Sequence, residues 1–266
     1  MNDMHSQEDQ LNQAEKARRF AEFHVVGAPL VLYNAWDAGS AKSILEAGAK
    51  AIATSSWSVA AAQGYSDGEA IPIEFAEQIV ERITSTVHVP VTVDFEGGYS
   101  DDDGVLAANI ARLLDLGVIG INFEDRVVKG SGLYCAERQA RRIAAIRKTA
   151  AQKEIDLFIN ARTDVFFEID NAEKAVGEAL ERAKAYAAAG ASGFFVPGLV
   201  NDALISRVAK AVTLPVNVMV MDGVPPNDRL TELGVARISY GPIPYVAAMN
   251  ALGAQAKATS PVAPQD

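Results

Sequence analysis

The chain has 266 residues, a net charge of −10 and a pI near 4.9, and 49% of its residues are hydrophobic. This charge argues against a broad nucleic-acid-binding surface, because such surfaces use Lys and Arg to neutralise phosphates. No run of 18 apolar residues could span a bilayer, and the polar first residues lack the apolar core of a secretory signal. A single cysteine, Cys135, cannot form an internal disulfide, which fits a reducing compartment. From the charge, the lack of an apolar span and the cysteine count together, we expect a cytoplasmic protein with no nucleic-acid or membrane partner.

Short apolar runs alternate with amphipathic helical segments along most of the chain. The predicted strands are residues 30–34, 50–55, 89–93, 119–124, 157–162, 193–197, 216–221 and 237–240. The helices predicted after them are residues 37–47, 73–86, 102–116, 136–152, 172–189, 202–212, 226–233 and 244–256. We expect residues 1–258 to form one domain, with a helical extension at 1–24 (helix near 10–24), and residues 259–266 to form a disordered tail.

Eight strand-then-helix units predict a (β/α)8 barrel, because parallel strands need crossover connections and eight of them close into a ring. A doubly wound open sheet is the alternative fold. Such a sheet normally carries a glycine-rich phosphate-binding turn, and the sequence contains neither GxGxxG nor GxxxxGK[ST].

Acidic residues follow two neighbouring strands of the predicted barrel, whose site should lie at the carboxyl ends of its strands. Asp94 and Glu96 follow strand 89–93, and Glu124 ends the next strand. Two residues apart on an extended backbone, Asp94 and Glu96 should point to the same side. Ligands that are all oxygen suit Mg²⁺ or Mn²⁺. The alternative is that Asp94 only forms a turn ahead of Gly97-Gly98.

The fifth predicted strand ends in Arg162, and Asn160 lies two residues before it. The planar guanidinium of Arg162 is suited to a substrate carboxylate or phosphonate, which it can bind with two parallel hydrogen bonds. The alternative for Arg162 is a structural ion pair with a neighbouring acid such as Glu124. We count both Arg162 and Asn160 as candidate substrate-binding residues.

The second strand is followed by Ser55, Ser56 and Trp57, which offer hydroxyl and backbone N–H donors to an anion. The alternative is that these residues only begin a loop, with Trp57 packed as a lid. Asp67, in GYSDGE, is placed to reach over the barrel mouth, or it is a simple turn acid.

Six motifs together resemble the isocitrate lyase and phosphoenolpyruvate mutase superfamily, from about Leu30 to the final helix. They are YNAWDAGSA, TSSWSVAAAQGYSDGE, VTVDFEGGY, GINFED, FINARTD and GFFVPG. The resemblance implies a (β/α)8 barrel with a Mg²⁺ site and substrates that resemble 2-oxo acids. It also implies a homo-oligomer, commonly a tetramer, in which the last helix is exchanged between neighbouring subunits.

The resemblance also implies roles for individual residues. Asp94 matches the direct metal ligand, and Glu96 and Glu124 match acids that hold the metal through water. The segment Ser55 to Trp57 matches the part that receives a substrate carboxylate and carbonyl. The residues matched to catalytic positions are Arg162, which binds substrate, and Asp67, an acid of the mobile segment near the mouth.

Two departures from the family pattern concern the loop after Glu124, which reads DRVVKGSGLYCAERQ. It lacks the Lys-Arg-Cys-Gly-His or Lys-Lys-Cys-Gly-His motif of the lyases that cleave isocitrate or methylisocitrate. It also lacks the Lys-Thr-Asn-Ser type of loop of the phosphonate-processing members. The sequence therefore resembles a less characterised branch with an intact metal site and a short loop.

The leading functional hypothesis is a Mg²⁺-dependent lyase that cleaves or decarboxylates a C–C bond of a small 2-oxo or 2-hydroxy (di)carboxylate through a metal-stabilised enolate. One alternative is C–P bond chemistry by a phosphonopyruvate hydrolase or phosphoenolpyruvate mutase. The other is a metal-dependent binder of 2-oxo acids without catalytic activity.

Overall fold

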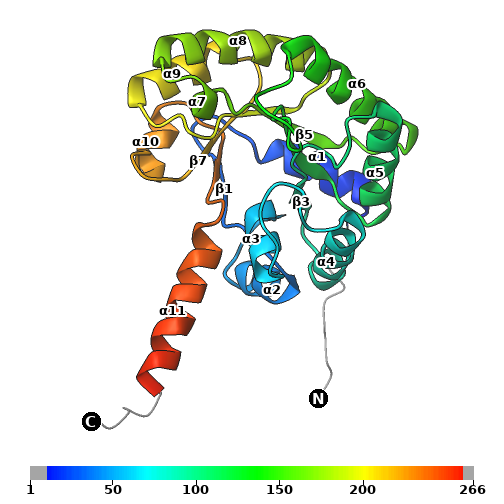
Figure 1. Ribbon diagram of the computed structural model, residues 1–266, viewed down its shortest axis with the longest axis vertical. Helices are drawn as coiled ribbons and strands as arrows, with labels where there is room; N and C mark the ends of the chain where they lie inside the picture. The colour runs from blue at the N-terminus through cyan, green and yellow to red at the C-terminus, as the bar shows by residue number, and fades with distance from the viewer. Residues whose placement is uncertain (1–10, 260–266) are drawn as a thin grey trace.

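Eight parallel strands form the centre of the computed structural model, which describes residues 11–259 (Figure 1). The sheet order is β1-β8-β7-β6-β5-β4-β3-β2, and a parallel bridge between Ala35 and Thr54 joins the chain after β1 to the chain after β2. The predicted (β/α)8 barrel is thereby confirmed. The strands are β1 Leu30–Leu32, β2 Ile52–Ala53, β3 Val91–Asp94, β4 Gly120–Glu124, β5 Phe158–Arg162, β6 Gly193–Phe195, β7 Val216–Met219 and β8 Arg237–Ser239.

Helices alternate with these strands, and the structure contains two helices that the sequence analysis did not predict. These are α3 (Ser56–Ala62) and the single turn α7 (Val165–Glu168), both directly after strand ends. Ser55 begins α3, since its hydroxyl accepts a hydrogen bond from the Ser58 N–H. The remaining helices are α1 Gln13–Glu22, α2 Ala38–Glu46, α4 Ile73–Thr86, α5 Asp103–Asp115, α6 Ala136–Gln152, α8 Ala172–Ala188, α9 Asp202–Ala211, α10 Asn227–Glu232 and α11 Ile243–Thr259.

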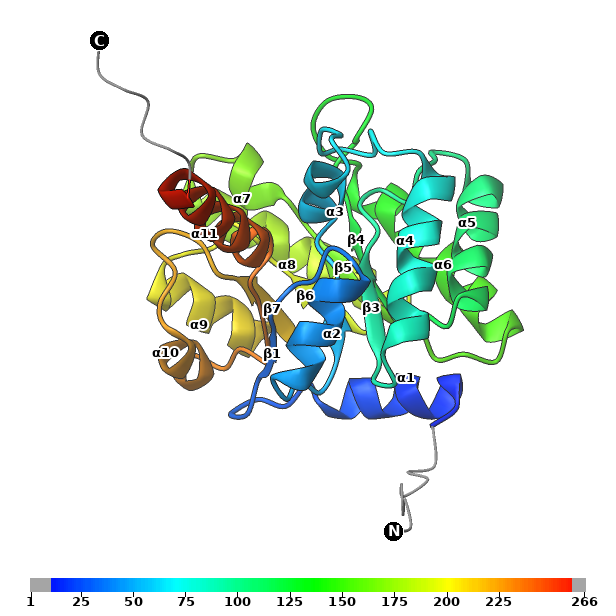
Figure 2. The same cartoon turned by 90° about the horizontal axis from the view of Figure 1, so that it is seen from below.

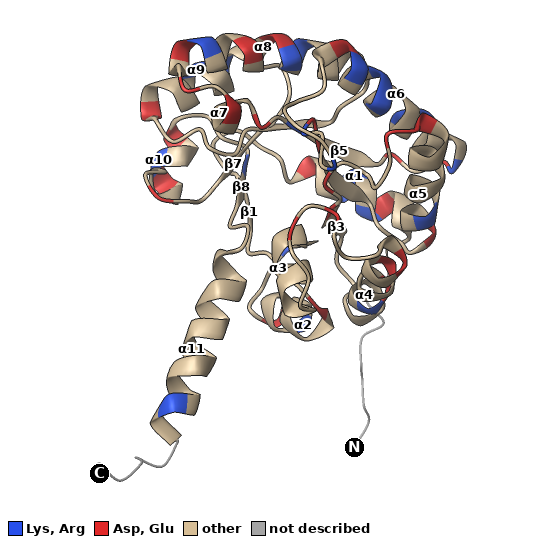
Figure 3. Ribbon diagram, in the orientation of Figure 1, with Lys and Arg blue, Asp and Glu red and all other residues tan. Residues whose placement is uncertain are grey.

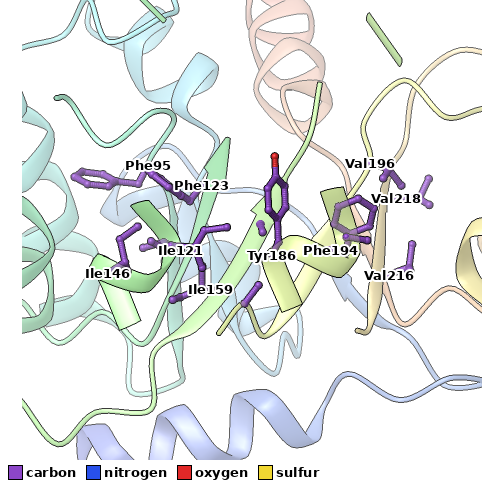
Figure 4. Packing of buried hydrophobic residues seen from close by; sticks show 14 of the residues in the cluster. Phe95, Ile121, Phe123, Ile146, Ile159, Tyr186, Phe194, Val196, Val216 and Val218 are labelled. Atoms are coloured by element: carbon purple, nitrogen blue, oxygen red, sulfur yellow. The ribbon is translucent and has the colours of Figure 1, made fainter. Parts of the chain in front are cut away.

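Side chains on the outer face of the strands pack against the surrounding helices (Figure 4). Ile121 and Phe123 of β4 are fully buried with Ile146 of α6, and Phe194 of β6 is buried with Tyr186 of α8. Burying each such side chain contributes roughly 1.5–3 kcal/mol relative to leaving it exposed. This layer fixes the positions of the strands, and therefore of the polar residues at their ends.

The end of the barrel opposite the strand carboxyl termini is closed by α1, which runs across it (Figure 2). Phe20 of α1 is buried against Phe158 at an edge-to-face angle of 88°. Above this apolar floor the barrel interior is polar, because the buried side chains of Asn122, Asn160 and Arg237 face inward. The mouth of the barrel therefore lies over a polar interior.

The last helix, α11, leaves the barrel and extends away from it (Figure 1). Most of its side chains are exposed, and Leu252 is 60% exposed. No helix within residues 11–259 is long and apolar enough to cross a membrane. The predicted tail at 259–266 falls outside the described residues except for Thr259, which ends α11.

Candidate active site

Three carboxylates lie at the carboxyl ends of β3 and β4. Asp94 and Glu124 are the last residues of these neighbouring strands, and Glu96 follows Asp94 by two residues. The prediction of an extended backbone through Glu96 is wrong, because Glu96 has a φ of 48° in the left-handed region. Its side chain is nevertheless buried, and the oxygen Oε2 has no hydrogen-bond partner within residues 11–259. Backbone strain of this kind often marks a functional position.

The carboxylate of Asp94 is held by donors from two neighbouring segments. The backbone N–H and hydroxyl of Ser56 donate to Oδ2 at 3.1 and 2.8 Å, and the Asn122 amide donates to Oδ1 at 3.3 Å. The Asp94 N–H in turn donates to Thr54 Oγ1 at 2.9 Å. The Asp94 side chain is therefore fixed by hydrogen bonds to the segments on either side of β3 rather than by a local turn.

Burial and mutual repulsion change the acidity of the other two carboxylates. Burial raises the pKa of Glu96 to about 9, with further contributions from Asp67 and Asp94. Burial also raises the pKa of Glu124 to about 8, against the opposing field of Arg162. Gathered carboxylates favour protonation unless a cation offsets their charge.

The donor set at the mouth fits a hard cation that keeps water in its shell. Asp94, Glu96 and Glu124 all offer carboxylate oxygens as ligands. Glu96 Oε2 is a buried oxygen that has no donor among residues 11–259. Over the same residues, no three His, Cys, Asp or Glu side chains group closely enough to hold a metal ion by themselves. A cation here would need water molecules for the rest of its coordination, which is how Mg²⁺ is commonly bound.

Arg162 ends β5 beside Glu124, its partner in the sheet register, and makes two ion pairs. It binds Asp164 with Nε and Nη2 at 2.6 and 2.9 Å, and its Nη1 lies 3.0 Å from Glu124 Oε2. Although burial disfavours the charged form, Glu124 and Asp164 together raise the pKa of Arg162. A guanidinium has five N–H donors, so two remain beyond these contacts, and 19% of the side chain is exposed. The ion pair weighed as an alternative is therefore present, with donors to spare for an anion.

The other predicted site residues have different surroundings. Ser55 is buried and caps α3, whereas Trp57 is exposed at the mouth with its ring 6.0 Å from that of Tyr245. Asp67 is exposed as a whole residue, yet burial of its carboxyl group, together with the nearby Asp94 carboxylate, raises its pKa. Asn160 is buried beneath the mouth and donates to Asn122 rather than facing the opening. The structure thus gathers Ser56 and Asp67 around the acids and Arg162.

Two residues near the mouth, Glu69 and Asn122, are not among the site residues predicted from the sequence. Glu69 is a buried loop carboxylate that accepts a hydrogen bond from the Tyr99 N–H at 2.7 Å and lies 3.8 Å from Lys129. These residues line a cavity of about 140 Å³ beside the mouth. No periodic pattern signals a buried acid inside a loop. Asn122 carried a usable signal, since it precedes Glu124 by two residues on a strand and must share its inward side.

The chain is a parallel eight-stranded barrel with acids and an arginine at its mouth. These features place it in the class of (β/α)8-barrel proteins whose site lies at the carboxyl ends of the strands. Within that class the chain belongs to the phosphoenolpyruvate phosphomutase family, whose model matches residues 20–260. Solved structures with the same fold include one described as a member of the PEP mutase/isocitrate lyase superfamily, at 22% identity and a TM-score of 0.79. The resemblance noted in the sequence is therefore confirmed.

Several relatives align with most of the chain. An uncharacterised protein of Mycobacterium tuberculosis is 35% identical over 91% of this chain and 88% of its own length. A 2-methylisocitrate lyase of Escherichia coli is 28% identical over 84% of this chain and 76% of its own length. An oxaloacetate decarboxylase of Ectopseudomonas mendocina is 29% identical over 67% of this chain and 61% of its own length. The characterised relatives are thus enzymes that act on small carboxylates.

Solved structures support the same assignment. A putative phosphonomutase from Burkholderia cenocepacia is 46% identical, with a TM-score of 0.91 over 94% of this chain and all of the other. A phosphonopyruvate hydrolase in complex with oxalate and Mg²⁺ shares the fold at 20% identity, with a TM-score of 0.79 over 90% of this chain and 84% of the other.

Proposed function

We propose that this chain is a Mg²⁺-dependent lyase that cleaves or decarboxylates a C–C bond of a small 2-oxo or 2-hydroxy (di)carboxylate. The observation that carries the proposal is the arrangement around Asp94. Its carboxylate is fixed by Ser56 and Asn122 next to the buried Glu96 oxygen that has no donor within residues 11–259. Such an arrangement leaves the fixed Asp94 carboxylate and a second oxygen without a donor available to a hard cation.

Each residue would have a separate task in this reaction. Asp94 would bind the ion directly, while Glu96 and Glu124 would hold water molecules in its shell. The two N–H groups of Arg162 that remain beyond its ion pairs would orient a substrate carboxylate. When bound, Mg²⁺ supplies the Lewis-acid stabilisation of the negative charge that develops on the 2-oxygen as the bond breaks.

Decarboxylation suits this mouth better than a retro-aldol cleavage that needs a cysteine acid. Cys135 is exposed at the start of α6, and His24 is stacked on Phe158 at the floor of the barrel, near α1. Loss of CO₂ leaves an enolate that water can protonate. The similarity to oxaloacetate decarboxylases supports this version of the proposal.

The test is a screen of 2-oxo and 2-hydroxy acids with excess Mg²⁺, in which release of pyruvate and release of phosphate are both measured. Oxaloacetate and substituted malates cover C–C cleavage, and phosphonopyruvate covers C–P cleavage. We expect Mg²⁺-dependent pyruvate from a C–C substrate without phosphate. Binding of oxalate without turnover of any compound would contradict the lyase and favour the non-catalytic binder.

C–P bond chemistry is the second candidate, and the similarity to the putative phosphonomutase favours it. The loop after β4 also places Lys129 near the mouth, 3.8 Å from Glu69. Phosphate released from phosphonopyruvate, or its rearrangement to phosphoenolpyruvate, would establish this candidate in place of the first.

We also propose that the protein is a homo-oligomer in which α11 covers another subunit. Figure 3 shows charged residues over the barrel helices, whereas the described part of α11 carries a single charged residue, Lys257. Val31 on β1 and Tyr33 just after it are 46% and 45% exposed, so part of the barrel wall also lacks a cover within the described chain. An apolar helix and a bare strand face are complementary surfaces.

The cytoplasmic location and the absence of nucleic-acid and membrane partners stay predictions from the sequence.

A further inference from the structure

Asn122 lies in the middle of β4, directly beneath the mouth. In the sheet it is paired with Asp94 of β3 on one side and with Asn160 of β5 on the other. It is buried, and it shares the inward side of the strand with Glu124. Asn122 is therefore placed between the proposed metal ligand and the polar interior of the barrel.

The amide of Asn122 has only one orientation that satisfies its neighbours. Its oxygen accepts hydrogen bonds from Asn160 Nδ2 at 2.8 Å and from Arg237 Nη2 at 3.1 Å. With the amide turned over, its NH₂ group would face these two donors and Asp94 would face an oxygen. The two interior donors thus direct the NH₂ group toward Asp94 Oδ1, 3.3 Å away.

Arg237 is an unusual donor for this purpose, because it is a cation that is only 1% exposed. Within residues 11–259 it makes no ion pair, its Nη1 has no hydrogen-bond partner, and its Nε has only a long contact of 3.4 Å to Ser239. Burial lowers the pKa of Arg237 to about 9, and the field of Asp94 opposes that shift. A buried charge without a direct counter-ion costs stability, which argues for a role in the site above it.

We propose that Asn122 is a positioning residue that fixes Asp94 for metal binding, with its own amide oriented by Asn160 and Arg237 from inside the barrel. Ser56 holds one carboxylate oxygen of Asp94 and Asn122 holds the other. A neutral amide can fix the carboxylate without neutralising it, whereas a direct contact with Arg237 would compete with a cation. The inference rests on the proposed Mg²⁺ site, and it assigns Asn160 to support of that site.

The test measures Mg²⁺ or Mn²⁺ dissociation constants by calorimetry on the full chain without substrate. Wild type and Asp94→Asn come first, because metal binding that depends on Asp94 is what the proposed function requires. We then expect Asn122→Leu to weaken metal binding about 10-fold, as is typical when a group that orients a metal ligand is lost. Asn122→Ala serves as a second variant if the larger side chain disturbs folding.

Asn217→Leu is the matched control, because Asn217 is an equally buried asparagine of the barrel interior that makes no contact with Asp94. The Asn217→Leu variant should lose thermal stability but keep the wild-type metal affinity.

Asn160→Leu should weaken metal binding in the wild-type background and add nothing in an Asn122→Leu background. Wild-type affinity in both Asn122 variants would overturn the inference while leaving the metal site intact. Equal losses in the Asn122 and Asn217 variants would show a merely structural role, and no metal binding by wild type would instead reject the proposed function.

Discussion

At the scale of single residues, the arrangement of Arg162 makes one substitution more informative than others. Arg162→Ala would leave Glu124 and Asp164 buried without their partner, a change that typically costs about 3–5 kcal/mol. Arg162→Lys keeps the charge but cannot bind Asp164 with two parallel bonds. We expect Arg162→Lys to fold, as judged by circular dichroism, and to lose most of the Mg²⁺-dependent turnover. Full activity in this variant would remove Arg162 from the site.

The acidity of Glu96 and Glu124 gives a prediction about stability and pH. Their pKa values of about 9 and about 8 exceed the ordinary value of 4.5, so the folded chain binds more protons than the unfolded chain between those limits. Stability without metal should therefore fall as pH rises from about 5 to about 9. We expect the Tm in EDTA to drop over this range, and added Mg²⁺ to restore it most at high pH.

Glu96→Gln is the control for this pH dependence, because glutamine keeps the shape but does not titrate. The fall in Tm with pH should be shallower in this variant than in wild type. Identical slopes for the two proteins would show that other groups cause the dependence.

At the scale of elements, the turn after β3 depends on Gly98. It has a φ of 81°, and a Cβ there would lie 2.4 Å from Leu106 Cδ1. Gly98→Ala should therefore cost more than the roughly 1–2 kcal/mol of left-handed backbone alone, and it should shift Glu96. Gly48→Ala is the matched control, with a φ of 94° and no atom within 4 Å of its added Cβ. Urea unfolding of both variants measures the difference, and equal losses would contradict the steric account.

The exposed helix α11 carries the second prediction at this scale. Leu252→Glu places a charge in its apolar surface, where Leu252 is 60% exposed. We expect the variant to dissociate into smaller species in light scattering coupled to size exclusion, whereas Gln255→Glu on the same helix should tolerate the charge better. A monomeric wild-type protein would contradict the assembly proposed for α11.

At the scale of the whole molecule, the barrel was predictable because alternation of strands and helices is a regular, local signal. Asp94, Glu124 and Arg162 were identifiable for the same reason, since each ends a strand. The left-handed conformation of Glu96 was not predictable. Gly97-Gly98 indicates a turn at the glycines, but no pattern shows that the glutamate before them also adopts a positive φ. The hydrogen bond from Arg237 to Asn122 joins residues 115 positions apart, and no local sequence pattern predicts such a contact.

The proposed function requires Asp94 to organise a Mg²⁺ site for small 2-oxo-type carboxylates at the barrel mouth. Calorimetric titration of oxalate into wild type and Asp94→Asn, each with Mg²⁺ and with EDTA, distinguishes a site organised by metal and Asp94 from one that needs neither. We expect oxalate to bind wild type with Mg²⁺, and not to bind in EDTA or to Asp94→Asn. Oxalate binding that needs no metal, or that survives the loss of the Asp94 carboxylate, would contradict this expectation.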